Sequence, residues 1–169
     1  MRSRRVGRRK AEDGRRKTED GGRKFRLFGL LALISMVSAL ACSREKSEGA
    51  KIQDRLSDTE IKYFTNGKKL YTQHCSNCHM ENGEGLGTLI PPLKNADYLL
   101  KDVPGAATII VNGINGSLVV NGKEYNQPMP ANPKLNPSEV TEILTYISNS
   151  WGNEYGGVSL DDVKAVLNK

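Results

Sequence analysis

The chain has 169 residues, of which 37% are hydrophobic and 26% are charged. This size suits one ordinary domain with a tail and excludes two full domains. The formal net charge of +6 is concentrated at one end, because residues 1–41 hold 12 Lys/Arg against 4 Asp/Glu, whereas residues 42–169 hold 13 against 15. The globular part is therefore slightly acidic, which excludes a basic domain that binds nucleic acid.

The first 41 residues have the pattern of an export signal. A basic stretch ends at Arg26, and the segment from Leu27 to Ala41 (LFGLLALISMVSALA) has no charged residue. As a helix of about 1.5 Å per residue this segment is about 22 Å long, which is short of a hydrocarbon core about 30 Å thick. We therefore expect residues 1–41 to be a basic, disordered n-region followed by a signal peptide.

The residues that follow suggest a lipid anchor. Ser38 to Cys42 (SALAC) resembles the lipobox of bacterial lipoproteins, in which the cysteine is acylated and becomes the first mature residue, although Ala39 stands where leucine is usual. The alternatives are ordinary cleavage that leaves Cys42 as a free thiol, or an uncleaved anchor. We expect lipidated Cys42 to hold the mature protein to a membrane, on the periplasmic side of a bacterial cell envelope.

The mature chain is predicted to be a tether followed by one mainly α-helical domain. Residues 42–57 are mostly polar and charged, which predicts a flexible tether, and residues 58–169 form the predicted domain. Ser57, Asn136 and Ser159 each precede an acidic residue by three positions, as helix-capping residues do. The predicted helices run from about Asp58 to Gln73, from Asn95 to Lys101, from Gly105 to Val111, from Pro137 to about Trp151, and from Ser159 onward.

One small hairpin interrupts this helical pattern. Asn121-Gly122 separates two short runs, at residues 118–120 and 123–125, and this dipeptide supplies the positive φ angles of a type I′ turn. A small domain with modest apolar content buries little surface by itself. We therefore expect a bound group to fill its centre.

The segment Cys75 to His79 (CSNCH) indicates what that group is. Its C-x-x-C-H spacing is that of covalent c-type haem attachment. Two thiols separated by two residues reach the two vinyl groups of one haem, and the next histidine places its imidazole on the iron. A thioredoxin-like redox pair would need a βαβ context, and a zinc site would need four ligands. The sequence around Cys75 and Cys78 indicates neither.

Met129 is the predicted ligand on the other side of the iron. Two of the four methionines lie in the export signal, and Met80 follows His79 directly, which keeps it on the proximal side. Pro128 and Pro130 flank Met129 and restrict the backbone to a stiff, extended loop. A methionine that only fills a gap in the core is the alternative. His/Met ligation raises the haem potential and fills both axial positions, which opposes a catalytic haem.

With these features, residues 62–151 resemble a class I monohaem cytochrome c. The resemblance implies a mainly α fold around one covalent haem c, with the hairpin inserted before the axial methionine loop. It also implies that the Pro91 carbonyl oxygen accepts the other ring N–H of His79 and that Leu93 packs on the haem. Met80 departs from the glycine usual after the motif.

The resemblance extends to a helix crossing. Gly67 and Tyr71 lie eight and four residues before Cys75, and they resemble the small residue and the aromatic of the family's N-terminal helix. By the same resemblance their partners on the C-terminal helix are Ile143 and Tyr146.

The function that this resemblance implies is one-electron transfer rather than catalysis. The partners are expected to be a redox donor and a redox acceptor at a respiratory membrane, such as an oxidase, a reductase or a dehydrogenase, and the protein a monomer or an enzyme subunit. The alternatives are a fixed haem subunit of an oxidoreductase and, if Met129 does not coordinate iron, a ligand-binding or peroxidase-like haem protein.

Overall fold

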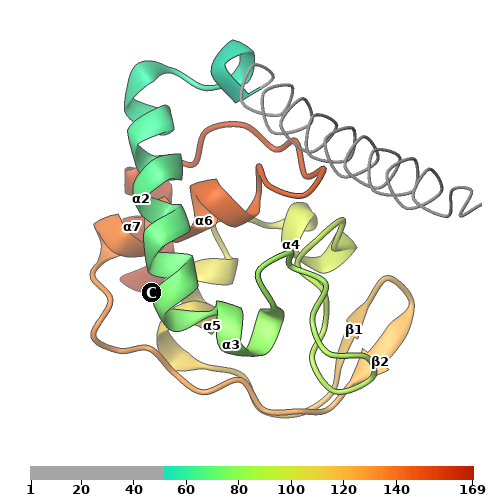
Figure 1. Cartoon of the computed structure of the whole chain (residues 1–169). Coiled ribbons are helices and arrows are strands. Elements are labelled where there is room, and N and C mark those ends of the chain that lie inside the picture. The colour runs from blue at the N-terminus through green and yellow to red at the C-terminus, as the bar shows by residue number, and fades with distance from the viewer. Residues whose placement is uncertain (1–51) are drawn as a thin grey trace, which may run out of the picture. The chain divides into compact units, whose positions relative to one another are not determined.

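The structure is a computed structural model that describes residues 52–169. The predicted n-region, signal peptide and Cys42 lie outside these described residues. Figure 1 shows the order of the elements in the domain. They are α2 (Asp58–His74), α3 (Ser76–His79), α4 (Asp97–Lys101), α5 (Ala106–Asn112), β1 (Leu118–Val120), β2 (Lys123–Tyr125), α6 (Pro137–Ile147) and α7 (Leu160–Leu167).

The domain begins earlier than the sequence predicts. Residues 52–55 are helical, and the Leu56 amide donates a helical hydrogen bond of 3.0 Å to the Ile52 carbonyl oxygen. Leu56 itself is only 5% exposed. The prediction of a flexible tether is therefore wrong for its last part, because burial of this apolar side chain fixes the segment. Within residues 52–169 no helix has both the length and the apolar composition that crossing a membrane requires.

Local capping explains where the two principal helices begin. Ser57 and Asn136 form complete capping boxes with Glu60 and Glu139 at the starts of α2 and α6, as predicted. The predicted end of α6 near Trp151 is wrong, since the helix stops at Ile147. The chain turns away there through a tight segment with buried polar side chains.

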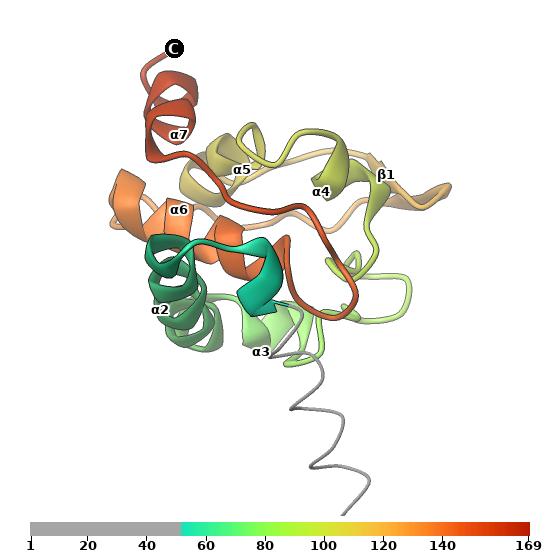
Figure 2. The ribbon, with the colours of Figure 1, turned by 90° about the horizontal axis from the view of Figure 1, so that it is seen from above.

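The crossing of α2 and α6 forms the centre of the core, and Figure 2 shows the two helices side by side. A Cβ atom on Gly67 would lie 1.9 Å from the Glu142 carbonyl oxygen and 2.9 Å from Cβ of Tyr146, so only glycine permits this approach. The ring centroids of Tyr71 and Tyr146 are 5.4 Å apart. Tyr146 is thus a partner as predicted, whereas the backbone of Glu142, rather than Ile143, faces Gly67.

The predicted hairpin is present at the far side of the domain from α2 (Figures 1 and 2). Its turn residues, Asn121 and Gly122, have φ angles of 51° and 73°, as a type I′ turn requires. The Asn121 amide donates to Asp97 Oδ1 at 2.7 Å, and the Asp97 amide donates to Asn121 Oδ1 at 3.0 Å. This reciprocal pair fixes the hairpin to the start of α4.

Candidate functional site

The CSNCH segment lies at the junction of α2 and α3. The Cys75 amide donates to the Tyr71 carbonyl oxygen at 2.8 Å, which continues α2 by one residue. The amides of Cys78 and His79 then donate to the Cys75 carbonyl oxygen at 3.1 and 2.9 Å. This single helical turn, α3, is too short to be recognised from periodicity in the sequence, and it brings both thiols and the imidazole onto the same cavity.

The cavity has a volume of about 480 Å³, within the range of roughly 300–1,000 Å³ that is usual for sites of small molecules and cofactors. Its wall is mostly apolar and comes from many parts of the chain: α2, the CSNCH turn, residues 89–93, α4, α5, the hairpin, residues 127–130 and α6. A planar apolar group with reactive or coordinating atoms near Cys75, Cys78 and His79 suits this wall. The residues therefore fit a haem.

His79 is held in one orientation by a backbone carbonyl. Its Nδ1 lies 3.1 Å from the Pro91 carbonyl oxygen, and because a carbonyl oxygen can only accept, Nδ1 carries the proton. The lone pair is then on Nε2, which makes no hydrogen bond to any described residue. The side chain is 8% exposed, and burial lowers the pKa of His79 although the bond to Pro91 raises it. Burial is the larger of the two effects, so it favours a neutral imidazole whose Nε2 can bind a metal.

Close packing holds the Pro91 carbonyl beside this ring. The Gly85 amide donates to the His79 carbonyl oxygen at 3.1 Å. A Cβ atom on Gly85 would lie 2.3 Å from the Ile90 carbonyl oxygen and 2.6 Å from that of Pro91. Gly85, at φ 67°, thus lets the chain fold back tightly on itself. The predicted Leu93 also lines the cavity and is half-buried.

Met129 lines the same cavity as His79. Its backbone forms an isolated bridge with Ile114, with amide-to-carbonyl distances of 3.0 and 3.1 Å in the two directions. Gly113 lies against this bridge, since a Cβ atom there would be 2.5 Å from the Met129 carbonyl oxygen. The backbone of the methionine is therefore fixed by Ile114 as well as by the flanking prolines.

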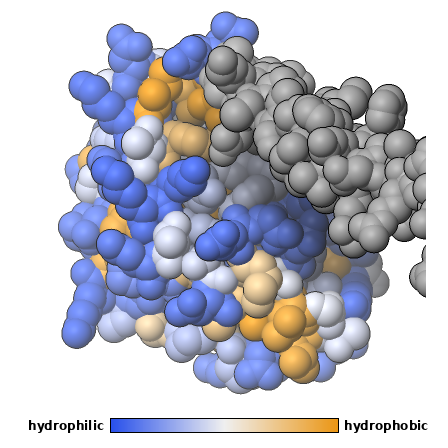
Figure 3. All heavy atoms as spheres, in the orientation of Figure 1, coloured by the Kyte–Doolittle hydropathy of each residue, from blue (hydrophilic) through white to orange (hydrophobic). Residues whose placement is uncertain are grey.

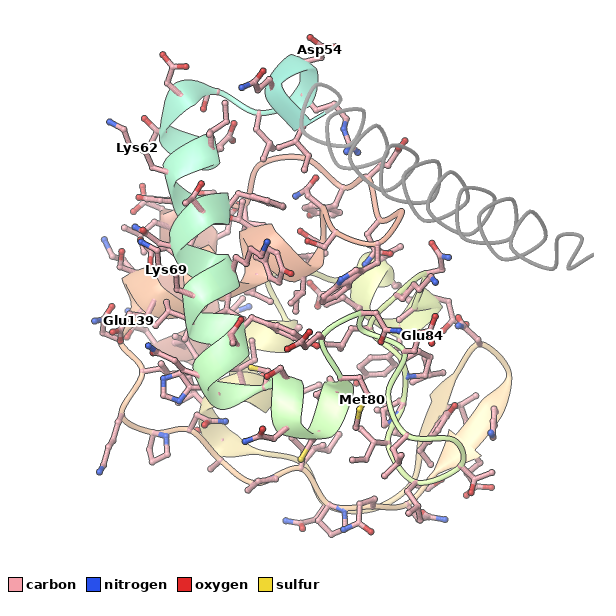
Figure 4. The ribbon with its side chains drawn as sticks, in the orientation of Figure 1. Asp54, Lys62, Lys69, Met80, Glu84 and Glu139 are labelled. Atoms are coloured by element: carbon pink, nitrogen blue, oxygen red, sulfur yellow. The ribbon has the colours of Figure 1, made fainter. Side chains whose placement is uncertain are left out.

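Met80 lies elsewhere. Figure 4 shows it beyond the end of α3, with Glu84 farther along the same loop. Met80 is not among the residues that line the cavity, and its φ and ψ angles of 62° and 158° fall in a region that is almost restricted to glycine. Of the methionines in the described residues, only Met129 reaches the cavity wall.

The two cysteines of the CSNCH segment form no disulfide, and Cys75 is half-buried whereas Cys78 is exposed. Burial, and then the neighbouring Cys78, raise the pKa of Cys75 to about 11. Redox-active C-x-x-C pairs instead have a thiolate with a lowered pKa, and the sheet in the described residues is one antiparallel pair of strands. Both observations argue against the thioredoxin-like alternative.

The zinc alternative also lacks support. Between residues 52 and 169, no three His, Cys, Asp or Glu side chains come together as a metal cluster. A structural zinc ion needs about four such ligands. The described residues therefore do not supply the ligand set of a structural zinc site.

The outer surface near the loop between α3 and α4 is more apolar than the outer face of α2. Figure 3 shows mostly hydrophilic residues over α2, and hydrophobic ones in two places, near the top of the domain and in the lower part of the view. Figure 4 shows Lys62 and Lys69 pointing outward from α2. The loop contributes Leu86 and Leu89, which are 47% and 55% exposed. Leu89 also lines the cavity, so the cavity and this apolar surface adjoin.

Comparisons with known proteins agree with this geometry. The sequence model of a family described as cytochrome c matches residues 64–151. A cytochrome c-552 of Thermus thermophilus is 34% identical over 91 residues, which are 52% of this chain and 69% of that protein. The cytochrome c subunit of the alcohol dehydrogenase (quinone) of Gluconobacter oxydans is 28% identical over 101 residues, which are 58% of this chain but only 21% of that subunit.

Proposed function

This chain belongs to the cytochrome c family, and from that premise we propose that Cys75 and Cys78 bind its haem c covalently while His79 and Met129 coordinate the iron. The protein is a haem-carrying electron carrier and not an enzyme. When bound, the haem supplies one-electron chemistry by cycling between Fe(III) and Fe(II). The observation that carries the assignment is that Cys75, Cys78, His79 and Met129 line the same cavity.

The protein's residues keep the ligands fixed. The Pro91 carbonyl oxygen orients the His79 ring and favours the tautomer with a free Nε2. The bridge to Ile114 and the flanking prolines hold the backbone of Met129. The mostly apolar cavity wall excludes water. Ligands that move little between two oxidation states suit a carrier, because little structure then has to rearrange when an electron arrives or leaves.

Absorption spectroscopy of a Met129→Ala variant tests the ligand assignment. The wild-type oxidised protein is expected to be low-spin with the weak Met–Fe charge-transfer band, and the variant to lose that band and bind carbon monoxide rapidly after reduction. Met80→Ala is the matched control, since Met80 does not line the cavity, and it should keep the wild-type spectrum. An unchanged spectrum in Met129→Ala would refute the assignment. Rapid carbon monoxide binding by the wild type would favour a ligand-binding or peroxidase-like protein.

We propose that the partners are a redox donor and a redox acceptor at a respiratory membrane, such as an oxidase, a reductase or a dehydrogenase. The similarity to a dehydrogenase cytochrome subunit supports a second candidate, a fixed haem subunit of an oxidoreductase. Purification of the full chain in mild detergent separates the two. A carrier should elute as a monomer, and a fixed subunit should elute with a larger enzyme in constant proportion.

We also propose that lipidated Cys42 anchors the mature protein on the periplasmic side of the cell envelope, by the tether that follows it. The support is the SALAC segment, which resembles a lipobox. Mass spectrometry of the mature N-terminus should find a diacylglyceryl group on Cys42, and Cys42→Ser should release the haem protein into the soluble fraction. A mature chain that begins elsewhere and has an unmodified Cys42 would contradict the anchor.

A further inference from the structure

The position of the Pro91 carbonyl oxygen is not fixed by backbone hydrogen bonds donated from Pro91 or Pro92. Pro91 and Pro92 both lack an N–H, so neither residue can donate a backbone hydrogen bond. The segment is instead held at its two flanks. On the upstream side the Ile90 amide donates to the Leu86 carbonyl oxygen at 3.3 Å, and on the downstream side the Leu93 amide donates to that of Gly83 at 2.8 Å.

Asn153, after the end of α6, supplies further bonds to the downstream flank. Its Nδ2 donates to the Leu93 carbonyl oxygen at 2.9 Å and to the Ile147 carbonyl oxygen at 2.7 Å. Its Oδ1 accepts from the Asn95 amide at 2.7 Å. The side chain is 2% exposed, and a buried amide with all these bonds satisfied is strongly held. It joins the last turn of α6 to the segment that faces His79.

We propose that Asn153 is a positioning residue, which keeps the Pro91 carbonyl oxygen at hydrogen-bond distance from His79 Nδ1 and so sets the orientation and basicity of that imidazole. Because proline rings fix φ, a shift at Leu93 is transmitted through Pro92 to the Pro91 carbonyl with little local compensation. This inference rests on the proposed role of His79 as a haem ligand. It adds to that role a residue 74 positions later in the chain, which no local motif marks.

Asn149 offers a matched control. It is 3% exposed, and its Nδ2 donates to the carbonyl oxygens of Thr145 and Gly156 at 2.9 and 2.8 Å. Its Oδ1 accepts from the Gly156 amide at 2.9 Å. The chemistry and burial are those of Asn153, but the bonds remain within α6 and the turn after it and do not reach residues 91–95.

The experiment compares Asn153→Ala with Asn149→Ala in the haem-loaded protein, since both changes remove a buried amide without adding charge. Solvent exchange of the His79 ring N–H, followed by NMR in the reduced state, should be at least fivefold faster in Asn153→Ala than in Asn149→Ala. The reduction potential should also be higher in Asn153→Ala, because a weaker bond to Pro91 makes the imidazole less basic. A smaller difference in exchange, or equal potentials, would overturn the proposal and leave Asn153 a purely stabilising residue.

A second pair of variants covers failure to fold. If Asn153→Ala does not accumulate, the same two measurements are made on Asn153→Ser and Asn149→Ser, in which the hydroxyl retains one hydrogen-bonding group, and the same thresholds apply. A different observation would contradict the proposed haem ligands, namely a wild-type spectrum that is not low-spin and has no Met–Fe absorption. The exchange of the His79 ring N–H still reports the bond to Pro91 in that case.

Discussion

The Tyr71 hydroxyl donates a hydrogen bond of 2.6 Å to the Met80 carbonyl oxygen. Tyr71 is 1% exposed, and its ring centroid lies 5.4 Å from that of Tyr146 and 5.2 Å from that of Trp151. Burial raises the pKa of this hydroxyl well above its usual range, so it remains a donor. The Tyr71 side chain therefore packs among the aromatic rings of the core and also holds Met80, the residue that follows the CSNCH turn.

Replacing Tyr71 by phenylalanine tests the hydroxyl alone. The ring and its contacts remain, while the Met80 carbonyl keeps only its bond from the Gly83 amide, which is 3.2 Å long. We expect the free energy of unfolding of the haem protein to fall by about 1 kcal/mol, measured by denaturation in guanidinium chloride. Tyr155→Phe, at a side chain that is 44% exposed, should change it little. Equal effects of the two changes would contradict this role of the hydroxyl.

Met80→Gly should stabilise the protein. The backbone angles at Met80 lie in a region almost restricted to glycine, where a side chain costs about 1–3 kcal/mol. Greater freedom of glycine in the unfolded chain offsets roughly 0.5–1 kcal/mol of the gain. Met80→Ala separates the effect of backbone strain from the effect of losing the methionine side chain, because alanine keeps the strained backbone but lacks the longer side chain. Denaturation should rank the glycine variant above the alanine variant by about 1 kcal/mol, and the reverse order would show that position 80 is unstrained.

Gly67→Ala should separate the two central helices. The new Cβ would lie 1.9 Å from the Glu142 carbonyl oxygen, so α2 or α6 must shift, and overpacking of this kind costs about 1–3 kcal/mol. Thermal unfolding of the haem protein gives the measurement. Lys68→Ala is the control, since this neighbouring side chain of α2 is exposed, and it should leave the midpoint unchanged. Equal midpoint temperatures of unfolding for Gly67→Ala and Lys68→Ala would contradict this, because they would show that α2 and α6 can accommodate a Cβ atom at position 67.

Short-range patterns in the sequence predicted much of this structure. The capping boxes at Ser57 and Asn136 and the Asn121-Gly122 turn depend only on residues within a few positions of one another, and all three are present. The C-x-x-C-H spacing is equally local. The short turn α3 was missed because four residues show no period.

Features that depend on the tertiary fold could not be predicted in this way. Leu56 is buried in the folded domain, although its neighbours in the sequence have the composition of a tether. At the early end of α6 the Ile147 carbonyl oxygen accepts from Asn153. The other bonds of Asn153 reach Leu93 and Asn95, 60 and 58 positions away. Nothing in the neighbouring sequence marks an asparagine that satisfies carbonyl groups at such separations.

The most direct test of the account is the mass and absorbance of the purified mature chain after denaturation and treatment with a thiol reductant. We predict that one haem remains on each polypeptide, and that it stays attached by one bond in Cys75→Ala or Cys78→Ala and by none in the double variant. A colourless polypeptide with two free thiols at positions 75 and 78 would contradict the central claim.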